Sequence, residues 1–166
     1  MVTSIKGNDT STFGGNIDVP QIVTDGPVFD ARNSAVQNIS SSTWTKVQLD
    51  EELIDTNSNF DSTTNYRFQP TVAGYYQINC TWRINGTNHG AFYGGIYKNG
   101  SLDQILTGKQ YTVSSATVLL SGSRIVYFNG STDYLEMYAS ISATSPYFGY
   151  SGNSHCRFSG SLVRAV

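Results

Sequence analysis

The chain has few charged residues and few cysteines, and it lacks long apolar runs. Charged side chains make up 13% of its 166 residues, and 10 Lys and Arg against 12 Asp and Glu give a formal net charge of −2. An average domain has about a quarter of its residues charged. The chain therefore lacks the basic footprint of proteins that bind nucleic acid or anionic membranes.

The scarcity of apolar segments narrows the class of protein further. No run reaches membrane-spanning length, and the N-terminal sequence MVTSIKGNDTSTFGG has no apolar stretch of the kind that a signal peptide needs. We therefore expect a protein made in a cytoplasm, with no membrane insertion. Cys80 and Cys156 are the only cysteines. One disulfide could join them, but two buried free thiols are the favoured interpretation.

Aromatic and hydroxyl-bearing residues are abundant by contrast. Eleven Tyr, eight Phe and two Trp, with many Ser, Thr, Asn and Gly, favour β-structure. In residues 75–84 the apolar side chains fall on every second position, which is the period of a half-buried antiparallel strand. Similar short segments separated by turn signals run from residue 27 to the end, and none has a helical period. This pattern predicts an all-β antiparallel sandwich or barrel.

Proline and glycine residues mark where strands should begin and turn. Pro70 cannot donate to a sheet ladder and Gly74 can take a positive φ, so both predict a turn into a strand that begins near Tyr75. Asn-Gly pairs at 85–86, 99–100 and 129–130 predict hairpins, because type I′ turns need positive φ at both central residues. We interpret residues 1–26 as an arm that precedes a head domain of residues 27–166.

Two predicted strands carry tyrosine on the face opposite their apolar residues. These tyrosines are Tyr93, Tyr97, Tyr134 and Tyr138. One interpretation is that tyrosine is tolerated on exposed sheets and adds cross-strand packing. The other, which we favour, is a subunit interface that uses the apolar ring and polar tip of tyrosine together.

Five segments in order resemble the globular head domain of the complement first component's q subunit, a domain related to tumour necrosis factor. They are PVFDAR, FDSTTNYRFQPTVAGYYQINCTW, GGIYKNG, DYLEMYASI and SHCRFSGSLV. Phe68, Gly74, Tyr76, Phe158, Ser159, Gly160 and Leu162 match the family's motifs, and Pro70 matches with slightly different spacing. The resemblance covers about residues 27–166. It implies a ten-strand jelly roll that packs as a homotrimer with tyrosine-rich faces at the axis.

This chain departs from the animal members of that family. It lacks the collagen repeat of Gly at every third residue. No acidic cluster corresponds to the calcium site of some members, so we expect no metal and no cofactor. Residues 5–27 and 40–79 also resemble structural proteins of tailed bacteriophages, in which such jelly rolls form fibre tips or decorate capsids. That second resemblance implies a virion protein docked on other virion proteins by its arm.

The chemistry of the chain points away from an enzyme. His89 and His155 accompany no nucleophile motif such as G-x-S-x-G. Cys156 and its neighbour His155 would point to opposite faces of a strand, so they do not form a catalytic pair. The acidic run of residues 50–55 is interpreted as a solvated loop rather than a cation site. We nominate no catalytic residue.

One loop is a candidate for ligand binding. It carries Tyr147, Phe148 and Tyr150 among small residues just before the last predicted strand. Aromatic residues in such loops stack on sugar rings or anchor partner proteins, although rings can equally fold back and cap the sandwich. The alternative function is therefore a recognition module that binds a host surface glycan or protein.

Overall fold

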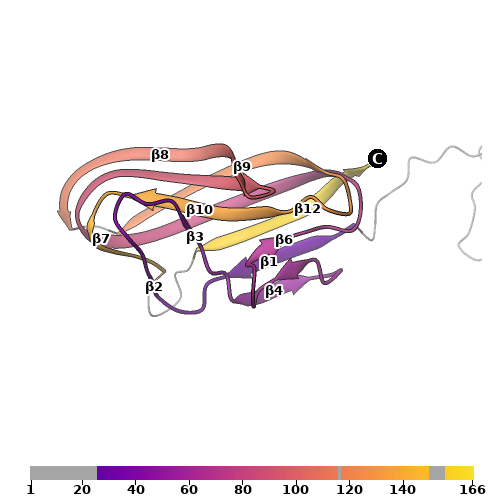
Figure 1. Cartoon of the computed structure of the whole chain (residues 1–166), viewed down its shortest axis with the longest axis horizontal. Helices are drawn as coiled ribbons and strands as arrows, with labels where there is room; N and C mark the ends of the chain where they lie inside the picture. The colour runs from indigo at the N-terminus through magenta and orange to yellow at the C-terminus, as the bar shows by residue number, and fades with distance from the viewer. Residues whose placement is uncertain (1–25, 116, 150–155) are drawn as a thin grey trace, which may run out of the picture.

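The computed structural model describes residues 26–115, 117–149 and 156–166, and these residues form twelve strands and no helix (Figure 1). The strands are β1 (Val28–Arg32), β2 (Gln37–Asn38), β3 (Thr45–Lys46), β4 (Glu51–Asp55), β5 (Phe60–Asp61), β6 (Arg67–Phe68), β7 (Gly74–Lys98), β8 (Ser101–Ser115), β9 (Val118–Phe128), β10 (Leu135–Ile141), β11 (Thr144–Phe148) and β12 (Arg157–Ala165). In the part of the chain that the structure describes, no helix is long and apolar enough to span a membrane.

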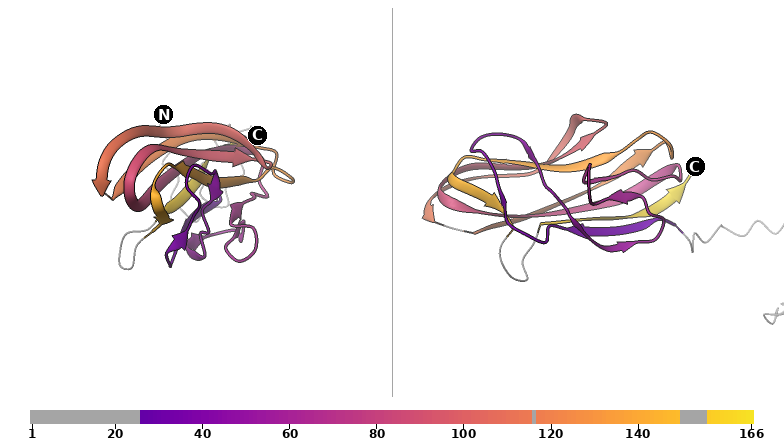
Figure 2. Two further views of the ribbon diagram at one scale, coloured as in Figure 1. Left: turned by 60° about the vertical axis from the view of Figure 1, so that its left-hand side comes forward. Right: turned by 60° about the horizontal axis from the view of Figure 1, so that its bottom comes forward.

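The long strand β7 belongs to both layers of the fold. Its residues 74–81 pair with β12 on one side, and its residues 74–84 pair with β9 on the other. Its residues 87–98 pair with β8, and residues 92–98 also pair with β10. The first sheet therefore has the order β4-β1-β12-β7-β9, and the second sheet has the order β5-β6-β10-β7-β8. In Figure 2 the ribbons of β7 to β9 arch over the indigo segments that follow residue 26.

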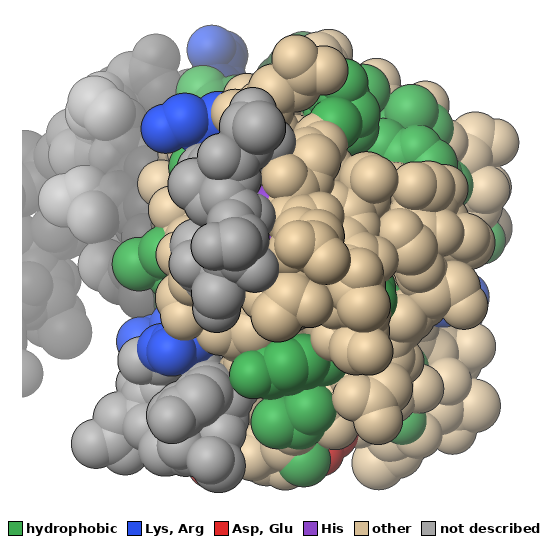
Figure 3. Space-filling model, turned by 90° about the vertical axis from the view of Figure 1, so that its left-hand side faces the viewer, with side chains coloured by type: hydrophobic (Ala, Val, Ile, Leu, Met, Phe, Trp, Pro, Cys, Tyr) green, Lys and Arg blue, Asp and Glu red, His purple; other side chains and the backbone are tan. Residues whose placement is uncertain are grey.

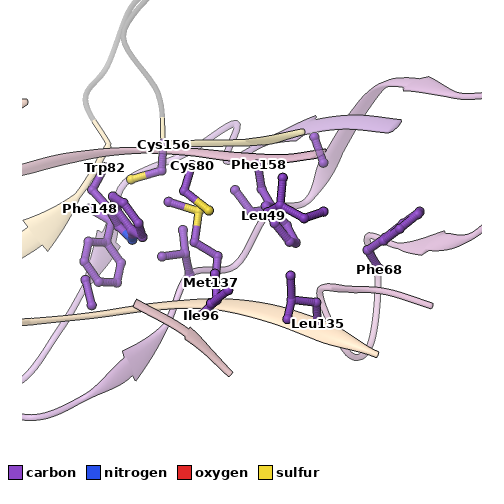
Figure 4. Packing of buried hydrophobic residues seen from close by; sticks show 14 of the residues in the cluster. Leu49, Phe68, Cys80, Trp82, Ile96, Leu135, Met137, Phe148, Cys156 and Phe158 are labelled. Carbon is purple, nitrogen blue, oxygen red and sulfur yellow. The ribbon is translucent and has the colours of Figure 1, made fainter. Parts of the chain in front are cut away.

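The two sheets pack face to face around one core. A Cβ atom on Gly94, in the second part of β7, would lie 2.7 Å from the ring of Trp82 in the first part. The Trp82 Nε1 donates a hydrogen bond to the Tyr138 carbonyl of β10 at 3.0 Å. Figure 4 shows the core side chains, among them Met137 and Phe158, between the layers. The protein is an all-β antiparallel jelly roll, as the sequence predicted; the predicted number of ten strands depends on how β7 and the two-residue strands are counted.

The alternation read from the sequence is confirmed strand by strand. Tyr76, Ile78, Cys80, Trp82 and Ile84 are all buried, and β7 begins at Gly74. In β10 the residues Leu135, Met137, Ala139 and Ile141 are fully buried as well. Both cysteines are free and buried. Burial raises the pKa of the Cys156 thiol to about 12 and also raises that of Cys80, so neither thiol ionises near neutral pH.

Only one of the three predicted Asn-Gly hairpins forms. Asn99 and Gly100, with φ of 53° and 80°, connect β7 to β8 as predicted. The prediction is wrong at 85–86, because β7 continues through these residues from one sheet to the other. It is also wrong at 129–130, where the chain leaves β9 in the first sheet for β10 in the second. The Asn129 Oδ1 accepts hydrogen bonds from the backbone N–H groups of residues 131–133, which fixes this corner.

The acidic run of residues 50–55 is not a solvated loop. Residues 51–55 form strand β4, which pairs with β1 at the edge of the first sheet. Glu51 is held by two hydrogen bonds from the Arg32 guanidinium, at 2.7 and 2.9 Å, and Asp50 accepts hydrogen bonds from Ser34. The acidic side chains are therefore paired locally, and the segment forms an edge strand. Charged side chains are common on edge strands.

The predicted arm lies almost entirely outside the described residues, which begin at Gly26. The Pro27 carbonyl accepts a hydrogen bond from the Leu162 N–H at 3.0 Å. The Val166 N–H bonds the Ala73 carbonyl at 3.2 Å, near the start of β7. The described chain thus begins and ends at the same end of the sandwich.

Candidate interaction surfaces

The tyrosines predicted at a subunit interface lie on the outward face of the second sheet. Tyr97 and Tyr138 stack with ring centroids 3.9 Å apart and an interplanar angle of 23°. The Trp44 ring lies 6.0 Å from Tyr97 and is tilted by 59°. We call Trp44, Tyr97 and Tyr138 the aromatic cluster. Burial raises the pKa of both tyrosines.

Side chains of the same chain cover most of these tyrosines. The Lys46 ammonium lies 5.9 Å from the centre of the Tyr138 ring and forms an ion pair with Glu136 at 2.5 Å. The Arg67 guanidinium lies 4.3 Å from the centre of the Tyr134 ring. Tyr93 alone among the four predicted tyrosines is open to solvent, with 41% of its surface exposed. The structure thus brings Tyr97 and Tyr138 into contact, and the role of all four in a trimer stays a prediction.

A larger exposed apolar surface lies on the outward face of the first sheet. The Lys98 ammonium lies 5.8 Å from the centre of the Tyr127 ring in this surface. Tyr75 pairs in register with Tyr127 of β9, and their ring centroids are 5.4 Å apart. We define the open face by five exposed apolar residues, Tyr75 on β7, Leu119, Ile125 and Tyr127 on β9, and Val163 on β12. This surface was not predicted from the sequence, although the alternation in SRIVYF sets Ile125 and Tyr127 opposite Val126 and Phe128.

A second, smaller set of exposed apolar residues lies on the outermost strand of the second sheet. Leu102 and Ile105 of β8 are 44% and 42% exposed. In the described residues β8 pairs only with β7, so it is the edge strand of the second sheet as described. We call this strand with its two side chains the β8 edge.

The predicted ligand loop is divided by the fold. Phe148 is fully buried in the core, so its ring has folded back and is closed to a ligand. Tyr147 is half-buried on β11, opposite Asn38 of β2 and Asn85 of β7. Tyr150 lies outside the described residues. The visible surface at the end of the molecule shown in Figure 3 is mainly uncharged and polar.

A pocket of about 300 Å³ opens beside β5 and β6. Its polar lining residues are Ser58, Asn59, Asp61, Arg67, Gln69, Thr71 and Ser131. Asp61 accepts hydrogen bonds from the backbone N–H groups of residues 63–65 and from the Asn65 side-chain amide at 2.7 Å. The bond from the Thr64 N–H is the largest cause of a pKa well below the usual range for this carboxyl. Asp61 therefore stays ionised and fixes the loop between β5 and β6.

The remaining candidate chemical groups form no recognisable centre in the described residues. His89 is buried, and its Nε2 lies 2.8 Å from the Gly86 carbonyl oxygen. His155 lies outside the described residues. Across residues 26–115, 117–149 and 156–166 no group of three His, Cys, Asp or Glu side chains could hold a metal ion.

The two sheets, the shared strand β7 and the sheet-to-sheet corner at Asn129 define a jelly roll of the complement C1q and tumour necrosis factor type. The globular domain of zebrafish complement 1qA protein is similar, with a TM-score of 0.58 and 15% identity over 84% of this chain and 99% of that chain. Eiger TNF from S. frugiperda has a TM-score of 0.59 and 8% identity over 85% of this chain and 93% of that chain. Murine APRIL at pH 5.0 has a TM-score of 0.54 and 9% identity over 81% of this chain and 98% of that chain.

These likenesses establish the fold, which the sequence resemblance implied. No family model and no curated protein matches the chain.

Proposed function

We propose that the protein is a non-enzymatic structural protein of a tailed-bacteriophage virion. In this proposal a homotrimeric jelly-roll head is docked on the particle by residues 1–26, as a capsid decoration protein or a short fibre tip. The resemblance of residues 5–27 and 40–79 to phage structural proteins supports the assignment to a phage particle. Docking by three arms at once raises the effective concentration of each, so weak single contacts suffice.

The open face is the observation that supports self-association. Four apolar side chains, Tyr75, Ile125, Tyr127 and Val163, are exposed close together on neighbouring strands, with Leu119 farther along β9. Such a group is unusual for a monomer, in which exposed apolar residues are normally scattered. A closed three-fold ring joins two different patches, because each subunit presents one patch to the next subunit and another to the previous one. The open face and the β8 edge supply two such patches. We therefore assign the subunit contact to them rather than to the aromatic cluster.

The covering of the tyrosines supports this assignment. Tyr138 is already stacked on Tyr97 and faced by Lys46, and Tyr134 is covered by Arg67. Side chains that already pack against others in their own subunit gain little from contact with a second subunit. Tyr75, Ile125 and Tyr127 keep 43% to 53% of their surface exposed and would gain most from burial.

The experiment that tests the virion proposal is mass spectrometry of purified phage particles. A copy number in the hundreds supports decoration, and a few trimers support a tail tip. Absence from the particle rejects the virion proposal. A chain lacking residues 1–26 should remain a folded trimer that no longer joins particles, because the core of the described residues is built from Phe29 onward.

The second candidate function is recognition of a host surface glycan or protein, either on the virion or by a free lectin-like protein. It is favoured by the pocket beside β5 and β6, whose wall combines amide, hydroxyl and guanidinium groups. Both candidates are compatible with one trimer, because the pocket does not include residues of the open face.

A further inference from the structure

We propose that the pocket beside β5 and β6 binds a neutral sugar residue of a glycan, with Arg67 and Gln69 as the main contacts. The pocket volume of about 300 Å³ lies at the small end of ligand pockets in proteins, roughly 300–1,000 Å³. It suits a single sugar ring and not a folded peptide segment. This proposal rests on the recognition function proposed above and names its ligand class. It does not depend on whether the protein is part of a virion.

The Arg67 guanidinium is held in place by contacts on two sides. Its plane lies over the Tyr134 ring, with Cζ 4.3 Å from the ring centre, and its Nη2 donates to the Gln69 Oε1 at 2.9 Å. Within the described residues its Nε and Nη1 make no hydrogen bond that would occupy them. A guanidinium fixed in this way presents several N–H donors in a rigid plane.

The local charge favours a neutral ligand over an anionic one. Arg67 pairs in register with Asp61 on one side and with Glu136 on the other, so the three side chains share one face of the second sheet. Lys46 forms an ion pair with Glu136. Two carboxylates therefore balance two cations around the pocket, and a second anion would meet no excess positive charge.

The amide side chains of the pocket are also positioned in advance. Gln69 donates from Nε2 to the Ser131 carbonyl at 3.0 Å while its Oε1 accepts from Arg67. Asn59 is only 7% exposed and accepts a hydrogen bond from the Thr71 N–H at 3.4 Å. Amides and hydroxyls both donate and accept, which matches sugar hydroxyl groups that do the same. Side chains held before binding lose little conformational entropy when a ligand arrives.

The aromatic cluster lies on the same face, beside the pocket. Arg67 on β6 is opposite Glu136 on β10, and Glu136 is opposite Tyr97 on β7. Two strand spacings separate Arg67 from Tyr97, roughly 10 Å. The apolar faces of sugars pack on aromatic rings. A short oligosaccharide seated in the pocket can therefore extend toward the half-buried Trp44 ring at the border of the aromatic cluster.

The test is a glycan array probed with the full-length protein in its native oligomeric state, carrying neutral oligosaccharides beside uronic- and sialic-acid-terminated ones. The best neutral probe is then titrated by isothermal calorimetry against Arg67→Ala, Gln69→Ala and Thr71→Trp, the last of which fills the pocket. Matched controls are Arg32→Ala on β1 and Gln48→Ala in the segment before β4, which lie outside the pocket and outside the proposed subunit contact. The melting temperature and solution mass of each variant establish that it is folded.

We expect neutral probes to bind, each pocket variant to lose at least tenfold in affinity, and both controls to bind like the wild type. The proposal is overturned if no glycan binds, if only acidic glycans bind, or if the pocket variants bind unchanged. None of these results bears on whether the protein is present in virions, so the two proposals fail separately.

Discussion

The outward faces of the two sheets differ although one strand, β7, contributes to both. On the first sheet, Tyr75 and Tyr127 form an aromatic pair that remains largely exposed. On the second sheet, Tyr97 and Tyr138 form a tighter pair that lies beside Trp44 and Lys46 of the segment before β4. Aromatic residues on an outer face therefore do not identify an interface by themselves. What distinguishes the two faces is the exposure of the rings: Tyr75 and Tyr127 stay 44% and 43% exposed, although the Lys98 ammonium lies 5.8 Å from the Tyr127 ring, whereas Tyr97 and Tyr138 are half-buried.

Trp82 is one of the core residues that hold the two sheets together. Its fully buried ring packs on Gly94, and its Nε1 bonds the Tyr138 carbonyl. We expect Trp82→Ala to lower the free energy of unfolding by about 3–5 kcal/mol, from lost burial and the cavity left behind. Chemical denaturation followed by circular dichroism measures this. A loss under about 1 kcal/mol would show that Trp82 does not join the two sheets.

A charge on the open face should separate the subunits. In Ile125→Asp an aspartate would be buried without a partner at the contact, which costs more than an ordinary interface residue contributes, about 2 kcal/mol or more. We expect a folded monomer in light scattering coupled to size-exclusion chromatography. Val36→Asp, an equally drastic change at a residue that is 45% exposed and belongs to neither patch, is the matched control and should leave the oligomer intact. An Ile125→Asp protein that keeps the wild-type solution mass would contradict the assignment of the contact to the open face.

Removing one ring of the aromatic cluster should affect stability and not assembly. Tyr138→Ala deletes the stacking partner of Tyr97 and the ring that Lys46 faces. We expect a loss of about 1–2 kcal/mol in unfolding free energy, since aromatic pairs add to the burial of their area. The solution mass should stay at the wild-type value. Dissociation of this variant at unchanged stability would show that the covered rings join subunits after all.

The smallest expected effect is acid sensitivity at the end of the second sheet that holds the pocket. Asp61 has a lowered pKa because of hydrogen bonds led by that from the Thr64 N–H. Burial opposes ionisation of Asp133, but bonds from Asn99, Lys98 and Asn129 outweigh it and lower its pKa as well. A carboxyl whose pKa is lower in the folded state stabilises the fold above its unfolded pKa of about 3.9. That contribution is lost as the pH falls through the folded pKa.

Melting temperatures between pH 6 and pH 2.5, roughly the range over which carboxyls titrate, measure this effect. The wild type should lose stability progressively below about pH 4. Asp61→Asn cannot titrate at this position, so its melting temperature should start lower and fall less steeply. Equal slopes for the two proteins would mean that Asp61 is not held as the structure describes.

The sequence predicted what depends on neighbours along the chain. Alternation in residues 75–84 places Tyr76 and Trp82 in the core, and the Asn99-Gly100 turn follows from the φ angles that these residues tolerate. The same signal failed at Asn85, because pairing with β11 and the buried bond from its Nδ2 to the Gly149 carbonyl carry β7 onward. Long-range contacts of this kind leave no trace in a local pattern.

The candidate sites were harder to predict for the same reason. The sequence predicted Phe148 as an aromatic residue of a ligand-binding loop, but its ring is buried in the core. The pocket joins Asn59, Arg67 and Gln69 to Ser131, which is distant in the sequence, through a side-chain contact to a backbone carbonyl. The open face could have been found, because Ile125 and Tyr127 alternate with buried Val126 and Phe128. What the sequence did not reveal was which aromatic face the chain covers itself.

The solution mass of the full-length protein tests the central claim most directly. If the open face and the β8 edge join subunits in a closed ring, light scattering will give a value near three times 18.1 kDa at micromolar concentration. A value of 18.1 kDa under the same conditions would mean that the open face is left uncovered, and it would contradict the proposed ring.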